Sequence, residues 1–135
     1  MLPLRYTRGW QTAGIALLLV VLVLALAPAV LFPFEMNAGG IGPDKWLHGT
    51  TFTFLIVWFS GQYPVRSYWR VALGMLAFGA FIELCQSLIT YRSAETMDLL
   101  ADSIGIVLGL AIALAGAGGW SLRLEGWLQA RGETG

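Results

Sequence analysis

Residues 13–34 read AGIALLLVVLVLALAPAVLFPF, a run without a charged side chain. About 20 apolar residues are enough for a helix to cross the hydrocarbon core of a bilayer. The preceding Arg5 and Arg8 are also typical of a secretory signal peptide, with Ala25-Leu26-Ala27 as a cleavage site. Because the run exceeds the usual apolar region of a signal peptide, and Pro28 follows directly, we interpret it as a retained membrane helix.

The composition of the whole chain agrees with a membrane location. Of its 135 residues, 57% are hydrophobic and only 12% are charged, whereas about a quarter are charged in a soluble domain. The formal net charge is zero, so no basic field favours nucleic acid. The single cysteine, Cys85, cannot form an intrachain disulfide or a CxxC zinc motif. We predict an all-α membrane protein with one domain, residues 1–135.

Polar and glycine-rich segments divide the remaining chain. Residues 34–43 and 61–70 are rich in turn formers, and residues 91–96 form a short polar turn. We therefore predict a bundle of four transmembrane helices at about 11–33, 44–61, 69–90 and 97–117, with a kink at Pro28 in the first. Residues 120–131 mix Trp and Leu with Arg123 and Glu125, so we expect an interfacial C-terminal tail.

Basic residues predict the orientation of this bundle. Four spans place the N-terminus, the 61–70 loop and the C-terminus on one side of the membrane. That side carries six basic residues and the other side carries two. Cytoplasmic loops are enriched in Lys and Arg, so we expect a multi-pass protein with both termini in the cytoplasm. The six are Arg5, Arg8, Arg66, Arg70, Arg123 and Arg131, and the two are Lys45 and Arg92.

Ionisable side chains of three segments fall at one membrane face in this topology. The second and fourth helices begin at the outer face and the third ends there, so their polar residues share one depth. Glu83 lies inside its span, where an unpaired charge costs roughly 2.5–3.5 kcal/mol on insertion scales. We therefore predict a polar cluster that opens outward. Its members are Asp44, Lys45, His48, Glu83, Gln86, Arg92, Asp98 and Asp102.

These residue types suggest two kinds of role. His48, Glu83 and Asp102 are the candidates for acid–base catalysis, and His48 shares a helical face with Asp44. The other five are candidates for ligand binding: Asp44, Lys45, Gln86, Arg92 and Asp98. The excess of carboxylates implies either a protonated carboxyl or a bound cation. A divalent metal with oxygen ligands and one imidazole is one option for such a cation. Because no HExxH-type motif supports it, no metal ligand is assigned and the cofactor stays unassigned.

Simpler structural interpretations exist for several of these residues. Asp44 and Asp98 could each cap a helix, and the ionisable residues could serve as polar links between helices. Gly105-x-x-x-Gly109 is most simply a close helix contact. A homodimer through this glycine face is a further option that the sequence leaves open.

The same motifs resemble those of the VanZ-like family. They are Asp44-Lys45-x-x-His48-x-x-x-Phe52, Glu83-x-x-Gln86, Arg92 and Asp98-x-x-x-Asp102-x-x-Gly105-x-x-x-Gly109, within residues 42–114. The resemblance implies a small polytopic protein of the bacterial cytoplasmic (inner) membrane. The founding member of this family is associated with low-level resistance to the glycopeptide teicoplanin.

Three functions fit these observations. The first is binding or transport of an envelope lipid or lipid-linked glycan precursor at the outward cluster, which we favour. The second is an intramembrane enzyme that acts on such a lipid, with His48 as acid or base. The third is a structural or partner-docking protein in which the cluster holds the helices together.

Overall fold

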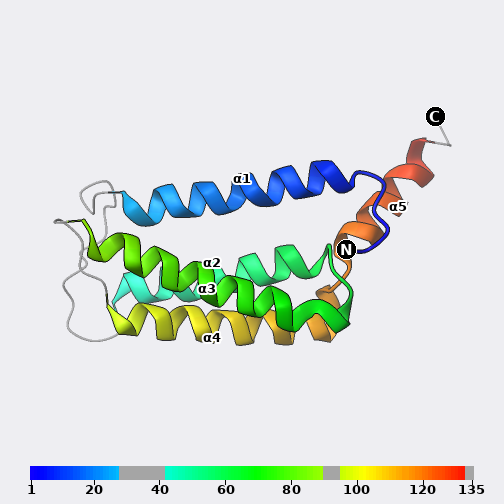
Figure 1. Cartoon of the computed structure of the whole chain (residues 1–135). Helices are drawn as coiled ribbons and strands as arrows, with labels where there is room; N and C mark the ends of the chain where they lie inside the picture. The colour runs from blue at the N-terminus through cyan, green and yellow to red at the C-terminus, as the bar shows by residue number, and fades with distance from the viewer. Residues whose placement is uncertain (28–41, 90–94, 133–135) are drawn as a thin grey trace.

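The computed structural model describes residues 1–27, 42–89 and 95–132, apart from the side chain of Pro43, and the regular elements of this part of the chain are all helices. Helices α1 to α4 lie side by side in alternating directions, and α5 leaves the bundle at an angle (Figure 1). The bounds are α1 Thr7–Leu26, α2 Pro43–Ser60, the 3₁₀ turn η2 Val65–Ser67, α3 Tyr68–Ser87, α4 Thr96–Ile112, the π-helical turn η3 Ala113–Ala117 and α5 Trp120–Gly132.

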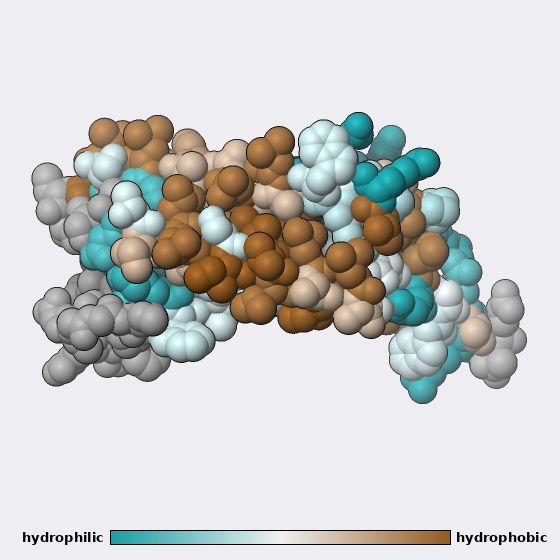
Figure 2. Space-filling view, turned by 90° about the horizontal axis from the view of Figure 1, so that it is seen from below, coloured by the Kyte–Doolittle hydropathy of each residue, from teal (hydrophilic) through white to brown (hydrophobic). Residues whose placement is uncertain are grey.

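Three helical segments are long and apolar enough to cross a membrane: Thr7–Leu26, Val65–Ser87 and Thr96–Gly132. Hydrophobic side chains form a broad belt across the middle of the molecule, and hydrophilic side chains gather at both ends (Figure 2). The prediction of an all-α membrane protein is therefore confirmed for the described residues. The side of the membrane that the termini face stays a prediction.

Helix α2 is not among these three segments because its first half is polar. One face of its second half instead lies in the core of the bundle. Phe52, Leu55 and Ile56 are at most 1% exposed and form the core with Met75, Ile82 and Ile106. Neighbouring helices thus cover this face of α2, which allows it to carry polar side chains into the bundle.

Glycines bring α2 and α4 into close contact. A Cβ atom at Gly105 would overlap the carbonyl group of Gly49, and one at Gly109 would lie 2.8 Å from the carbonyl oxygen of Thr53. The hydroxyl of Thr53 donates to the carbonyl oxygens of Gly49 (2.8 Å) and Gly105 (3.1 Å). Within lipid there is no hydrophobic driving force for helix association, so close van der Waals packing of this kind stabilises the contact. The predicted close glycine contact is therefore made between α2 and α4 of one chain, and a homodimer stays a prediction.

Helix α1 lies at the edge of the bundle. Its inner side packs partly against the core through Leu18, Val21 and Ala25. Its outer side exposes Ile15 and Val23, as expected of a surface that faces lipid. The helix begins at Thr7 rather than near residue 11, whereas its predicted C-terminal part and the kink at Pro28 lie outside the described residues.

At the end of the bundle opposite to where α2 and α4 begin, α5 binds the segment that precedes α1. The carboxylate of Glu125 is 4% exposed and accepts hydrogen bonds from the backbone N–H of Arg5 (2.7 Å) and Tyr6 (3.0 Å) and from the indole of Trp10 (2.8 Å). The sequence predicted that this segment lies in the interface. In the structure α5 is also anchored to the segment before α1. We call this contact the Glu125 junction.

Two glycines allow α5 to turn back toward α1. Gly116 has φ 125° and Gly119 has φ 68°, values that residues with a side chain rarely adopt. The indole of Trp120 then donates to the carbonyl oxygen of Val57 (3.0 Å) and packs against Trp10 and Trp58. The end of the bundle is therefore closed by aromatic contacts as well as by Glu125.

Candidate functional site

The end of the bundle at which α2 and α4 begin and α3 ends gathers most of the predicted site residues. We call this group the end cluster. Asp44, Lys45 and His48 belong to the first turns of α2, and Glu83 lies in the last turns of α3. Glu95, Asp98 and Asp102 come from the start of α4. Arg92 lies outside the described residues.

A hydrogen bond between His48 and Asp102 joins α2 to α4. Nδ1 of His48 lies 2.9 Å from Oδ1 of Asp102, whose side chain is completely buried. Gly79 of α3 makes room for this carboxylate, because a Cβ there would lie 2.5 Å from Asp102 Oδ2. When Asp102 is ionised it accepts the Nδ1–H bond, which fixes the ring and leaves Nε2 free to accept a proton or bind a ligand.

Lys45 neutralises carboxylates of its own chain. Its ammonium group lies 2.9 Å from Asp44, 2.8 Å from Glu95 and 3.4 Å from Asp98. With its side chain only 12% exposed, Lys45 is already engaged by protein groups. The structure therefore does not present it as a free cation for an anionic ligand.

Glu83 and Gln86, three residues apart on α3, have different surroundings. One oxygen of Glu83 accepts from the backbone N–H of Glu95 (3.0 Å), and the other is buried without a hydrogen bond among the described residues. Gln86 donates to the carbonyl oxygen of Ala25 (3.0 Å), which connects α3 to the end of α1. Gln86 thus serves as a polar link between helices, whereas Glu83 belongs to the end cluster.

The capping role suggested for Asp44 and Asp98 is wrong. Gly42 and Glu95 occupy the N-cap positions of α2 and α4, and neither helix has a side-chain cap. Asp44 and Asp98 instead lie in the first turns and direct carboxylates toward Lys45. Their charges also interact favourably with the positive ends of the two helices.

The end cluster holds more negative than positive charge. Its described carboxylates face Lys45 and the single imidazole of His48. Oxygens of four of them, including the 6% exposed Asp98, are buried without a hydrogen bond in the described part of the chain. Buried acceptors without donors are costly, so the site suits a group that brings donors or positive charge. The five carboxylates are Asp44, Glu83, Glu95, Asp98 and Asp102.

Sequence reasoning counted Glu95 among the excess carboxylates and placed Gly79 on the face of Glu83, but it named neither as a site residue. Glu95 contacts Lys45 through its side chain and Glu83 through its backbone. The available indication in the sequence was its spacing. Glu95 lies three residues before Asp98, directly before the first turn of α4. Gly79 lies four residues before Glu83 on the same face of α3, but its contact with Asp102 depends on how α3 packs against α4.

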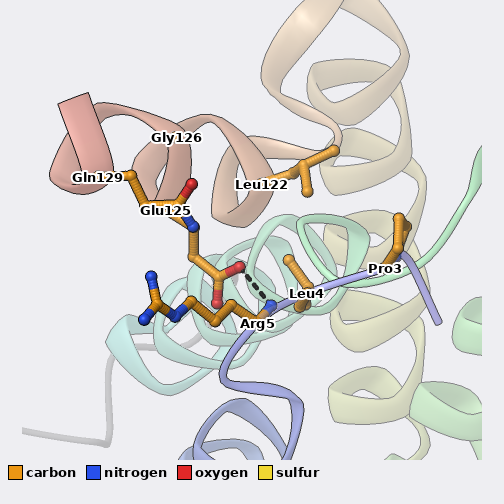
Figure 3. A pocket seen from close by; sticks show the side chains of 7 residues that line it. All are labelled: Pro3, Leu4, Arg5, Leu122, Glu125, Gly126 and Gln129. Carbon is orange, nitrogen blue, oxygen red and sulfur yellow. Dashed lines mark hydrogen bonds between the residues drawn. The ribbon is translucent and has the colours of Figure 1, made fainter.

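A pocket at the opposite end contains no predicted site residue. It has a volume of about 640 Å³ and lies between the chain start and α5, next to the Glu125 junction (Figure 3). The side chains of Arg5 and Glu125 lie at its wall (Figure 3). Both oxygens of Glu125 already accept protein hydrogen bonds, so the carboxylate has a structural role.

The apolar belt and the charged end define a polytopic helical membrane protein with a polar cluster at one end of its bundle. The model of the family described as VanZ/LLP1 matches residues 12–117. The chain therefore belongs to this family, and the resemblance seen in its motifs is confirmed. Comparisons with curated proteins and with solved structures gave no match.

Proposed function

We propose that the protein binds the polar headgroup of an envelope lipid or lipid-linked glycan precursor at the end cluster. The observation that carries this proposal is the set of buried carboxylate oxygens without hydrogen bonds at the end of an apolar bundle. Sugar hydroxyl and ammonium groups supply the donors that these oxygens lack. The apolar surface of the helices would hold the lipid chain alongside.

In this proposal the end cluster faces the outside of the bacterial cytoplasmic membrane, as the distribution of basic residues predicts. Both termini then lie in the cytoplasm. Sequestering an envelope precursor would change the sensitivity of the cell to glycopeptides, so teicoplanin sensitivity is one phenotype to measure. A homodimer is not required, because the proposed headgroup contacts come from one chain.

Native mass spectrometry of the detergent-purified protein tests this proposal. The probes are phosphatidylglycerol, phosphatidylethanolamine and a polyprenyl-linked glycan, each added in the presence of a chelator. Asp98→Asn should weaken binding of one probe without lowering the melting temperature. Glu125→Gln is the control for binding alone: this buried carboxylate lies at the other end of the bundle, so the variant should bind all three probes although the loss of its three hydrogen bonds lowers its melting temperature. Equal binding by Asp98→Asn and the unchanged protein would contradict the proposal.

The His48–Asp102 pair favours a second candidate, an intramembrane enzyme that acts on the same lipids. A buried carboxylate that orients an imidazole is the arrangement of a general base. In this candidate His48 activates water through Nε2, while Glu83 or Asp98 stabilises the imidazolium that forms. Incubation of the protein with the three probes, followed by mass analysis of products, tests it. Catalysis would be rejected if the unchanged protein, like His48→Gln, left all three probes unaltered.

A further inference from the structure

The end cluster contains two groups of possible cation ligands that share Asp98. In one group, Asp44, Glu95 and Asp98 offer carboxylate oxygens within 4.8 Å of one another. Lys45 occupies this group, at 2.8 to 3.4 Å from the three carboxylates. In the other group, His48, Glu83 and Asp98 offer ligand atoms within the same distance. Among the described residues, no Lys or Arg forms an ion pair with Glu83 or lies in an ion pair with Asp102, the partner of His48.

We propose that His48, Glu83 and Asp98 bind a divalent transition-metal ion such as Zn²⁺. One imidazole and two carboxylates are a common ligand set for this ion. In a tetrahedral site with bonds of about 2.1 Å, ligand atoms lie roughly 3.4 Å apart. One ligand atom from each of the three residues already lies within 4.8 Å of the others, so these atoms need to approach by at most about 1.4 Å.

Asp98 supplies the strongest independent support. Its side chain is only 8% exposed, and its Oδ1 makes no hydrogen bond in the described part of the chain. The contact of this oxygen with Lys45, at 3.4 Å, is the longest of the three contacts of that ammonium group. A bound cation beside His48 and Glu83 would give this buried oxygen a closer partner.

Asp102 completes the arrangement as a positioning residue. Ligands to zinc that come from histidine usually donate their other ring N–H to a carboxylate, which fixes the tautomer and the ring orientation. Here Nδ1 of His48 pairs with the fully buried Asp102 at 2.9 Å. The second nitrogen, Nε2, is then the metal ligand. A preformed second contact of this kind distinguishes the group from an ordinary surface cluster of carboxylates.

The three ligands come from three different helices. A bound ion would therefore connect α2, α3 and α4 at the end of the bundle, and it would remove the excess negative charge of the cluster. This inference does not depend on the proposed headgroup binding, because it concerns the protein alone. A metal ion at this position would also give an anionic phosphate group a ligand that Lys45 does not provide.

Calorimetric titration of Zn²⁺ into untagged, chelator-treated protein in detergent tests the inference, with metal analysis for the stoichiometry. We expect one ion per chain. Glu83→Gln should abolish binding, and Asp102→Asn should weaken it by about 10–100-fold. Glu95→Gln, in the group occupied by Lys45, and Glu125→Gln, at the other end of the bundle, should bind like the unchanged protein.

Visible absorption after Co²⁺ substitution is the second readout, because it reports ligation even where a variant is less stable. His48→Gln, which removes the imidazole ligand, should change the Co²⁺ absorption spectrum, whereas Glu95→Gln should leave it unchanged. Absence of binding to the unchanged protein, or equal loss in Glu83→Gln and Glu95→Gln, would overturn the site. Zinc is titrated without lipid and headgroups are tested with chelator, so either proposal can fail without the other.

Discussion

Replacing Gly79 by alanine should break the His48–Asp102 hydrogen bond without changing any ionisable side chain. The new Cβ would lie 2.5 Å from Asp102 Oδ2 and 3.3 Å from Cζ of Phe52. An ordinary contact begins near 3.4 Å, so the carboxylate must move by roughly 0.9 Å, the difference between these two distances. The hydrogen bond between His48 and Asp102 is 2.9 Å long. A movement of the carboxylate by roughly 0.9 Å, away from the imidazole, takes the two atoms beyond hydrogen-bond distance.

The expected cost follows from three contributions. Overpacking of a tight site costs about 1–3 kcal/mol, and loss of a hydrogen bond to a charged group costs about 1.5–3 kcal/mol. Alanine in place of glycine in a helix returns about 1 kcal/mol. The free energy of unfolding should therefore fall by about 1.5–5 kcal/mol, and zinc affinity should fall with it.

Nitrogen NMR of ¹⁵N-histidine protein measures the effect directly. His48 is the single histidine of the chain, so its two ring signals need no assignment to a residue. We expect Gly79→Ala to move both signals toward those of a free imidazole. Gly74→Ala is the matched control on the same helix, because a Cβ at Gly74 meets no atom within 4 Å. It should keep the ring signals and be neutral or slightly stabilising.

Unchanged histidine signals and an unchanged melting temperature in Gly79→Ala would refute this reasoning. They would mean that α3 and α4 lie farther apart than the structure has them, and that Asp102 does not depend on the absence of a side chain at residue 79. An altered melting temperature with unchanged signals would refute only the part that concerns His48.

Three other changes test the rest of the structure. Glu125→Gln should lower the free energy of unfolding by roughly 2–4 kcal/mol, because a buried charged acceptor of three hydrogen bonds is lost; a melting curve followed by tryptophan fluorescence measures it, and an unchanged curve would count against the Glu125 junction. Gly109→Ala should destabilise the α2–α4 contact by about 1–3 kcal/mol, because its Cβ would lie 2.7 Å from Cβ of Ile56; thermal melting in detergent checks it beside Gly126→Ala, where a Cβ meets nothing within 4 Å. Single cysteines placed at Arg5 and Arg131 in a Cys85→Ser background should react with an impermeant thiol reagent only after the cell membrane is opened; labelling of intact cells at either position would show that the predicted orientation is wrong.

Much of the fold could be predicted from the sequence because membrane helices follow from local composition. A long apolar run without charges has few alternatives to a spanning helix, since every backbone polar group must be satisfied within lipid. The gathering of His48, Glu83 and Asp102 at one end could also be predicted, because successive antiparallel helices bring alternate ends together. For these residues the sequence positions alone determine the depth.

The pairing of side chains within the cluster was less accessible. Lys45 is adjacent to Asp44 in the sequence, but its shortest contact, with Glu95, depends on the packing of α2 against α4. Gln86 has the spacing of a site residue, yet it binds the backbone of α1 because α3 turns that side toward Ala25. Such choices depend on the rotation of each helix about its axis, which polar residues at similar depths do not determine.

The Glu125 junction was missed for a related reason. The α5 segment contains a carboxylate among Trp and Leu residues, a composition that is typical of a helix at the membrane interface. Its burial depends on backbone N–H groups from the other end of the chain, and backbone donors leave no mark in the sequence.

This junction also has a consequence for biogenesis. Arg5 and Tyr6 are synthesised before α1, whereas Glu125, their hydrogen-bond partner, leaves the ribosome only after all four bundle helices have been made. The segment before α1 must therefore wait, without its carboxylate partner, while the later helices enter the membrane. Closure of the bundle at this end is then a late step of assembly, and chains that stop before α5 lack the contact that completes it.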